Sequence, residues 1–146
     1  MATSRPTTIP AEFNAFLAEP RNAILSVARA DGRPPHATPV WFIYENGRFR
    51  ISITRTRSKS RLIERRPAIS LVIDDASRFR TVVVEGTARF SDSDAELIAL
   101  AGQLQAKYRG RQPQTQADHA ELLRGLRAEQ RVVLTLDPEH VMSWSR

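Results

Sequence analysis

The 146-residue chain contains no cysteine. This absence excludes disulfide bonds, thiol catalysis and metal sites built on thiolates. Histidine is also scarce, because His36, His119 and His140 are the only imidazole side chains and stand far apart in the sequence. We therefore expect no metal site.

Long apolar runs are missing as well. No segment approaches the roughly 20 consecutive apolar residues that a membrane span requires, and the first ten residues, MATSRPTTIP, lack the apolar stretch of a secretory signal. The sequence therefore predicts a cytoplasmic protein without a membrane partner. Its length and its 41% hydrophobic content fit a single domain over residues 1–146, in which residues 1–9 form a loose N-terminal segment.

The phosphate-binding loops of the common nucleotide folds are absent too. The sequence contains no GxGxxG, no GxxxxGK[ST] and no GxSxG pattern. This disfavours a Rossmann domain.

Positive charge, by contrast, is abundant in one place. Residues 48–66 carry eight basic side chains and one acidic one, whereas the other 127 residues carry 14 basic and 15 acidic side chains. A nearly neutral body with one cationic segment indicates a defined anionic ligand, although a solvated charged surface is the alternative. A nucleic-acid partner is not expected, because the segment lacks interleaved aromatic residues for base stacking.

Strand patterns dominate the first two thirds of the chain. Strand-like segments cover residues 23–29, 36–44, 48–54, 69–73 and 81–90, and Asn46-Gly47 predicts a two-residue hairpin turn because both residues tolerate positive φ. Gly86 lies inside one of these segments and indicates a bulge or a close backbone approach.

Helical patterns are grouped rather than alternating with the strands. Short helices are expected over residues 10–17 and 58–65. A longer helix is expected to begin at the capping pair Ser93 and Glu96, and a second longer helix is expected to include Leu122 and Leu126. Two further strands, 131–136 and 141–144, close the chain. This order favours an α+β, mainly β fold in which helices pack around an antiparallel barrel of six or seven strands.

The cationic segment includes a strand-to-helix corner that suits a phosphate. Ser52 and Thr54 offer hydroxyls, Arg57 and Lys59 offer charge, and a helix beginning near Ser58 offers unpaired amide donors. The alternative is a solvated helix with Ser58 as its N-cap.

Four blocks of the sequence resemble the pyridoxamine-phosphate-oxidase-like split β-barrel flavoproteins, and in particular their actinobacterial branch of oxidoreductases that use the deazaflavin coenzyme F420. The blocks are AILSVARADGRPPHATPVWFIYENGRFRIS at 23–52, RSKSRLIERRPAISLVIDD at 57–75, VVVEGTARF at 82–90 and RVVLTLDPEHVMSW at 131–144. The resemblance implies an FMN-binding-like split barrel that transfers a hydride between F420 and a small unsaturated or carbonyl substrate.

The resemblance also implies which residues hold the cofactor. The strand that follows the tricyclic ring corresponds to His36, Ala37, Thr38, Pro39 and Val40, beside Trp41. The phosphate site corresponds to Ser52, Ile53, Arg57, Ser58 and Lys59, with Arg61 as an addition.

A homodimer is a further implication of the resemblance. Phe79, Arg80 and Thr81 match the segment that reaches the cofactor of the partner subunit, so that both sites lie at the interface. The chain departs from relatives that read K-x-x-N-L, because Leu62 stands where the asparagine would be.

Two other functions remain open at this point. The first is FMN binding with pyridoxamine 5'-phosphate oxidase-like chemistry, and the second is a non-catalytic protein that binds F420, a fatty ligand or a tetrapyrrole. The sequence identifies no catalytic side chain. Histidine is a common proton donor in enzymes, but a lone histidine on a strand is more often structural, so we assign His36 no catalytic role.

Overall fold

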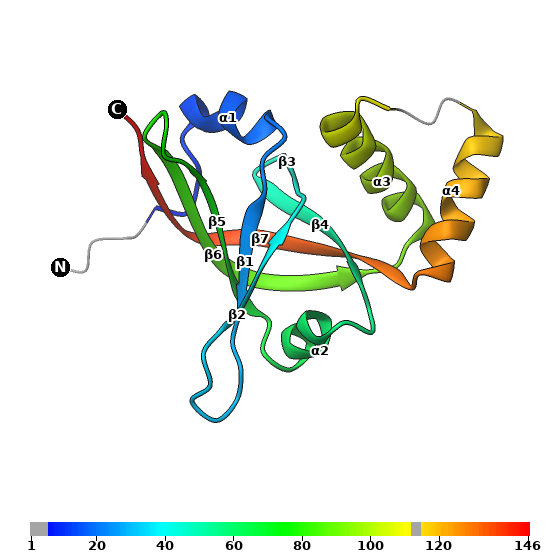
Figure 1. The fold of residues 1–146 in the computed structure, drawn as a ribbon, viewed down its shortest axis with the longest axis horizontal. Coiled ribbons are helices and arrows are strands. Elements are labelled where there is room, and N and C mark those ends of the chain that lie inside the picture. The colour runs from blue at the N-terminus through cyan, green and yellow to red at the C-terminus, as the bar shows by residue number, and fades with distance from the viewer. Residues whose placement is uncertain (1–5, 112–114) are drawn as a thin grey trace.

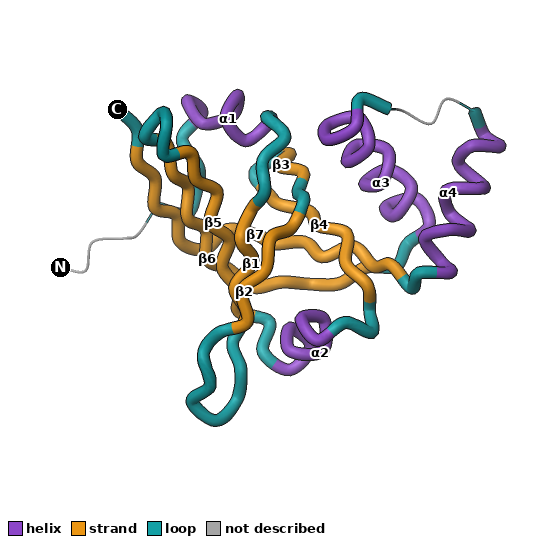
Figure 2. Tube along the Cα trace, in the orientation of Figure 1, coloured by secondary structure: helices purple, strands orange, loops and turns teal. Residues whose placement is uncertain are grey.

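The computed structural model describes residues 6–111 and 115–146, in which seven strands form one antiparallel sheet with the order β2-β1-β5-β6-β7-β4-β3. The strands are β1 (Ala23–Val27), β2 (His36–Val40), β3 (Ile43–Glu45), β4 (Arg48–Thr54), β5 (Ala68–Asp75), β6 (Arg80–Ser91) and β7 (Arg131–Trp144). The sheet curls into a half-barrel whose end strands, β2 and β3, are not paired with each other (Figures 1 and 2). This confirms the predicted α+β split barrel.

The helices surround the curled sheet. They are the 3-10 helix η1 (Ala11–Phe13), α1 (Asn14–Ala18), α2 (Ser58–Arg65), α3 (Asp94–Arg109) and α4 (Gln116–Ala128). Helices α1 and α2 lie at opposite ends of the half-barrel, and α3 and α4 form a pair beside it (Figure 1). Within the described part of the chain no helix is both long and apolar enough to cross a membrane.

The main core lies inside the half-barrel. Alternate residues of the strands point inward, as the pattern of buried and exposed residues along β4 and β5 shows. Helix α1 closes one end with Phe16 and Leu17, and α2 closes the other with Ile63, all of them at most 1% exposed. The position of α2 is therefore fixed by burial of one of its faces against the sheet.

A second, smaller core holds α3 on the outer face of the sheet. Leu97, Leu100 and Leu104 pack against Ile43 and Val133. The C-terminal turn of α3 is also tied down by polar contacts, because the Nζ of Lys107 donates to the carbonyl oxygens of Leu17 (2.8 Å) and Phe42 (2.9 Å). Burial lowers the pKa of Lys107 to about 8.

The predicted hairpin and bulge are both confirmed. Asn46 and Gly47 have φ angles of 54° and 76° and connect β3 to β4. The register of β6 against β7 shifts between Glu85 and Gly86. Helix α2 has the expected bounds, but its N-cap is Arg57 rather than Ser58, and no side chain caps it.

Two strand predictions need correction. The expected strand 36–44 is divided into β2 and β3, because the amide of Phe42 donates to the hydroxyl of Tyr108 (3.1 Å) instead of to a neighbouring strand. The expected strands 131–136 and 141–144 form one strand, since the bulge at Gly86 accommodates Pro138 within the β6–β7 pairing.

The N-terminal segment makes definite contacts where the structure describes it. Residues 1–5 lie outside the described part, so their predicted looseness stays a prediction. The amide of Val141 donates to the carbonyl of Pro6 (2.8 Å), and Ile9 is buried in the main core. Pro6 and Ile9 thus contact the body of the protein.

Candidate cofactor-binding site

The predicted phosphate corner is a hollow of about 370 Å³ between β2, β4 and the start of α2. Its lining comprises residues of β2 and β4, the first residues of α2 and one residue of β7, namely His36, Thr38, Ser52, Ile53, Thr54, Arg57, Ser58, Lys59 and Arg131. The structure therefore brings together segments that are distant in the sequence. We call this hollow the phosphate corner.

Three cations gather at the phosphate corner. Arg57 makes no ion pair with any described residue, and Arg131 pairs with Glu129 at 2.8 Å. Lys59 donates a hydrogen bond to the hydroxyl of Thr38 at 3.3 Å. Burial, together with the charges of Arg57 and Arg131, lowers the pKa of Lys59 below its usual value. An anion placed between these groups would relieve their mutual repulsion.

The backbone at the corner is held in a fixed position. Ser60 is fully buried and donates from its hydroxyl to the carbonyl of Thr54 at 2.7 Å. This bond ties the first turn of α2 to the end of β4. The amides of Ser60 and Arg61 donate to the carbonyl of Arg57, and α2 has no side-chain cap, so the amides of Ser58 and Lys59 are the ones available to an anion.

One buried polar atom at the corner has no partner in the described structure. The Nδ1 of His36 is inaccessible and forms no hydrogen bond there. Buried polar groups normally have a partner. Because this nitrogen is inaccessible, a ligand in the hollow does not contact it; the cations and the helix start are what fit a phosphate-bearing ligand.

A second hollow of about 620 Å³ adjoins the corner and shares Ser52, Lys59 and Arg131 with it. One wall is Pro39, Val40 and Trp41, and the opposite walls come from α3 and α4. The indole of Trp41 stacks on the ring of Tyr108 at 4.5 Å, with 2° between their planes. We call this hollow the ring groove. It has an aromatic side at Trp41 and a helical side on which leucines lie beside Gln105 and Arg109.

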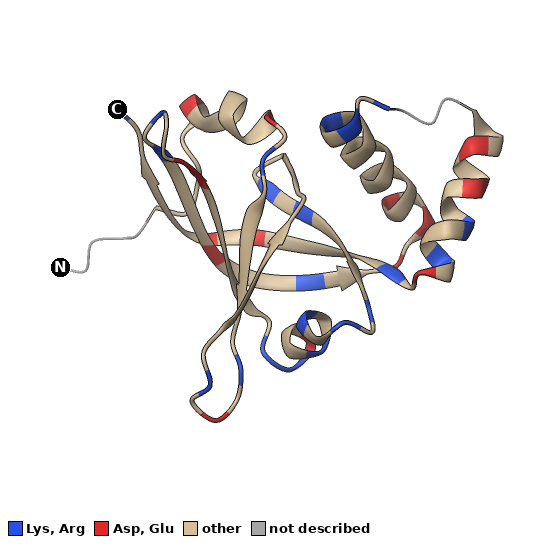
Figure 3. Ribbon diagram, in the orientation of Figure 1, with Lys and Arg blue, Asp and Glu red and all other residues tan. Residues whose placement is uncertain are grey.

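A third hollow of about 490 Å³ meets the phosphate corner at His36 and Ser58. Four arginines and one acid belong to its lining, which includes Arg29, Arg33, Arg61, Arg65 and Asp31. Figure 3 shows these basic positions on α2 and on the loop between β1 and β2. We call this hollow the arginine pocket.

Most of the predicted site residues thus lie around one continuous surface. His36, Thr38, Ser52, Ile53, Arg57, Ser58 and Lys59 line the phosphate corner, Pro39 and Val40 line the ring groove, and Arg61 lines the arginine pocket. Ala37 is exposed and lines none of the three hollows.

The structure does not bring Phe79, Arg80 and Thr81 to this surface. They lie at the turn between β5 and β6, where Phe79 is 57% exposed and has a φ of 52°. The guanidinium of Arg146 lies over its ring at 4.3 Å. Their predicted contact with a partner's cofactor stays a prediction.

Sequence reasoning missed two residues of the site. Arg131 lines both the phosphate corner and the ring groove, and Arg109 lines the ring groove with its guanidinium 5.4 Å from the centroid of Trp41. Arg131 opens a strand and lies outside the cationic segment, so its only available signal was its charge.

Solved structures share this fold. The conserved protein Rv2991 of Mycobacterium tuberculosis is 21% identical and has a TM-score of 0.80, with 99% of this chain and 90% of that chain covered. An F420 reductase is 24% identical and has a TM-score of 0.70, with 92% of this chain and 98% of that chain covered. An FAD-binding protein of Mesorhizobium loti is 16% identical and has a TM-score of 0.65, with 92% of this chain and 94% of that chain covered.

A search of the curated proteins found no match. The sequence pattern of a family does match, and it extends over residues 9–145, from the start of the core to the last strand. It includes every element that lines the three hollows. On this match the chain belongs to the pyridoxamine 5'-phosphate oxidase family.

Proposed function

We propose that the protein is an F420-dependent oxidoreductase acting on a small unsaturated or carbonyl substrate. The observation that carries the proposal is the continuity of three hollows, from the ring groove through the phosphate corner to the arginine pocket. FMN ends at its phosphate, whereas F420 continues beyond it into a lactyl-glutamate tail that bears carboxylates. Four arginines beyond the phosphate corner suit such a tail.

The residues of the chain supply binding and orientation in this proposal. The cations of the phosphate corner hold the phosphate, Trp41 and Val40 border the ring, and residues of α3 and α4 form the opposite walls of the ring groove. F420, when bound in reduced form, supplies the hydride. The remaining space of the ring groove receives the substrate.

A titration with F420 and, separately, with FMN tests this function. We expect saturable quenching of tryptophan fluorescence by F420, because Trp41 borders the ring groove, and weaker binding of FMN. Tighter binding of FMN would favour pyridoxamine 5'-phosphate oxidase-like chemistry instead. Tight F420 binding without turnover of any unsaturated or carbonyl acceptor would favour a non-catalytic F420-binding protein.

We further propose that the active form is a homodimer. An apolar row crosses the outer face of four neighbouring strands, because Ile24 pairs with Val72, Val72 with Val83, and Val83 with Met142. Ile24 and Met142 are 41% and 44% exposed. Exposed apolar rows of this kind mark association surfaces. In this proposal, the second copy that binds to the row is also the subunit whose cofactor Phe79–Thr81 would contact.

Replacing Met142 with lysine should convert the dimer to a monomer, because it places a charge in this apolar row. Light scattering would report the mass, and the F420 titration would report loss of affinity if the partner contributes to the site. Ala120→Lys, on the exposed surface of α4, is the matched control and should leave mass and affinity unchanged. A dimer that survives Met142→Lys would place the interface elsewhere.

A further inference from the structure

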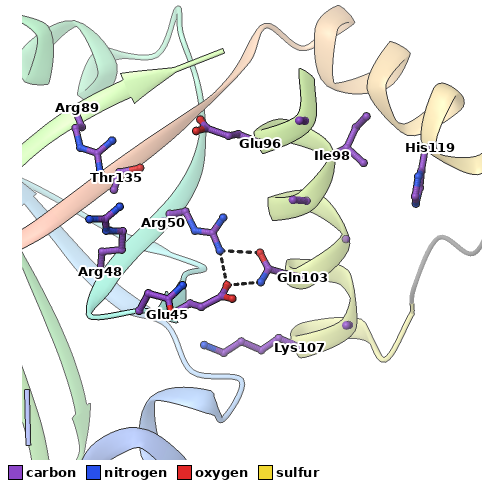
Figure 4. Close-up of a pocket in the computed structure, with 15 residues that line it drawn as sticks. Glu45, Arg48, Arg50, Arg89, Glu96, Ile98, Gln103, Lys107, His119 and Thr135 are labelled. Carbon is purple, nitrogen blue, oxygen red and sulfur yellow. Dashed lines mark hydrogen bonds and ion pairs between the residues drawn. The ribbon is translucent and has the colours of Figure 1, made fainter. Parts of the chain in front are cut away.

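A hollow larger than each of the three hollows of the cofactor site lies apart from them. It is a groove of about 950 Å³ between α3, the hairpin of β3 and β4, and the neighbouring strands (Figure 4). It shares no lining residue with the ring groove, the phosphate corner or the arginine pocket. Nothing in the proposed function uses it.

The helical side of this groove carries a stripe of small residues, beside which Glu96, Gln103 and Lys107 of α3 also line the groove. Ala95, Ala99, Gly102 and Ala106 recur on one face of α3, and Ile98 extends that face. The large leucines of α3 point instead into the second core. The spacing therefore leaves an apolar surface with room for carbon atoms of a ligand.

The sheet side of the groove is formed by hydrogen-bond donors. Thr135 of β7 pairs with Arg50 of β4 on one side and with Arg89 of β6 on the other. The three side chains make a row across adjacent strands, and all three line the groove (Figure 4). Two guanidinium groups thus flank one hydroxyl.

Thr135 is unusual among these residues because it is buried without a partner. It is 5% exposed, and its hydroxyl forms no hydrogen bond within the described residues. The hydroxyl itself is not among the inaccessible unpartnered polar atoms of the described residues, so it is open to the groove and free to donate a hydrogen bond there. Its position in the groove wall points to a ligand with a hydrogen-bond acceptor.

Two of the arginines that line the groove share one carboxylate. Arg48 and Arg89 both contact Asp137 through their Nε atoms, at 3.2 and 3.0 Å. Their terminal nitrogens make no hydrogen bond with residues of the described ranges and are free to bind an anion. Arg50, in contrast, is engaged, because it donates to Glu45 (2.6 Å) and to Gln103 (2.9 Å).

We propose that this groove binds an amphipathic carboxylate at a site distinct from the cofactor. The carboxylate accepts hydrogen bonds from Thr135 and from the terminal nitrogens of Arg48 and Arg89, and the apolar part lies on the small-residue face of α3. Glu96 also lines the groove and makes no ion pair with a described residue. It opposes the bound carboxylate and limits its affinity.

Calorimetric titration of the full-length protein with 4-phenylbutyrate, and with its neutral amide, tests the proposal. We expect one saturable site per chain for the acid and much weaker binding of the amide. Thr135→Val should lower the affinity for the acid about tenfold, because it removes a hydrogen bond to a charged group. Glu96→Gln should raise it, and Ala99→Phe should abolish it by filling the groove.

Arg109→Ala is the matched control, since Arg109 lines the ring groove and not this one. It should leave the affinity for 4-phenylbutyrate unchanged. Equal affinity for the acid and the amide, or unchanged binding in both Thr135→Val and Ala99→Phe, would overturn the proposal. A change of mass in Ala99→Phe by light scattering would overturn it too, because the groove would then be an interface between subunits.

Discussion

Replacing Gly86 with alanine is expected to lower the free energy of unfolding by about 2 to 4 kcal/mol, because the added methyl group has no room. Gly86 lies in β6, at the bulge where the register against β7 shifts. An added Cβ would fall well inside van der Waals contact with the carbonyl oxygen of Asp137 and 2.8 Å from Cδ1 of Leu136. The first of these obstacles is backbone, so it cannot rotate away.

The consequence extends beyond one strand pair. β7 is hydrogen bonded to both β6 and β4, and its residue Leu136 is fully buried in the main core. A shift of β7 away from an alanine at position 86 would therefore loosen the centre of the sheet. Chemical denaturation monitored by circular dichroism measures the loss.

Gly125→Ala is the matched control for this change. Gly125 lies inside α4, and a Cβ there would meet nothing within 4 Å. Alanine should raise the free energy of unfolding by about 0.5 to 1 kcal/mol, because glycine disfavours a helix interior. Equal stability of Gly86→Ala and the wild-type protein would mean that the bulge relaxes at little cost.

Local chemistry explains why much of the fold was predictable. The turn at Asn46-Gly47 and the helix α2 depend on residues that are neighbours in sequence, and both lie where expected. Gly86 also indicated the bulge, because a glycine weakens a strand interior and often marks a bulge or a close backbone approach.

Contacts between distant segments explain what sequence reasoning missed. The break between β2 and β3 depends on the hydroxyl of Tyr108, which lies 66 residues from Phe42 in the chain. Arg131 reaches the phosphate corner through the pairing of β7 with β4, and its guanidinium donates to the carbonyl of Ser52 across 79 residues. Neither contact changes the local sequence pattern from which strands and helices are predicted.

The groove along α3 was hidden for the same reason. Arg50, Thr135 and Arg89 belong to three strands, and only the register of the sheet places them in one row. In the sequence, Arg50 merely added to the charge of the cationic segment. The structure separates that segment into residues that line the phosphate corner and residues, such as Arg48 and Arg50, that line a different groove.

The second large effect is expected at Lys59. Replacing it with alanine should weaken F420 binding by about 1.5 to 3 kcal/mol, or roughly 10-fold to 150-fold, because a charge-assisted hydrogen bond to phosphate is lost. Fluorescence titration measures the dissociation constant, and circular dichroism confirms that the variant is folded. Arg55→Ala is the matched control, since Arg55 carries the same charge nearby but lines none of the three hollows.

The pH dependence of binding gives Lys59 a signature of its own. In the free protein, burial, followed by the charges of Arg57 and Arg131, lowers the pKa of Lys59. A bound phosphate favours the ammonium form and raises that pKa, so binding takes up a proton and affinity falls as the pH rises through the free-state value. Lys59→Arg should flatten this decline, because arginine stays charged. Protonation of the ligand itself affects binding to both proteins equally. If the affinity falls with pH in the same way in the wild type and in Lys59→Arg, then Lys59 does not bind the phosphate.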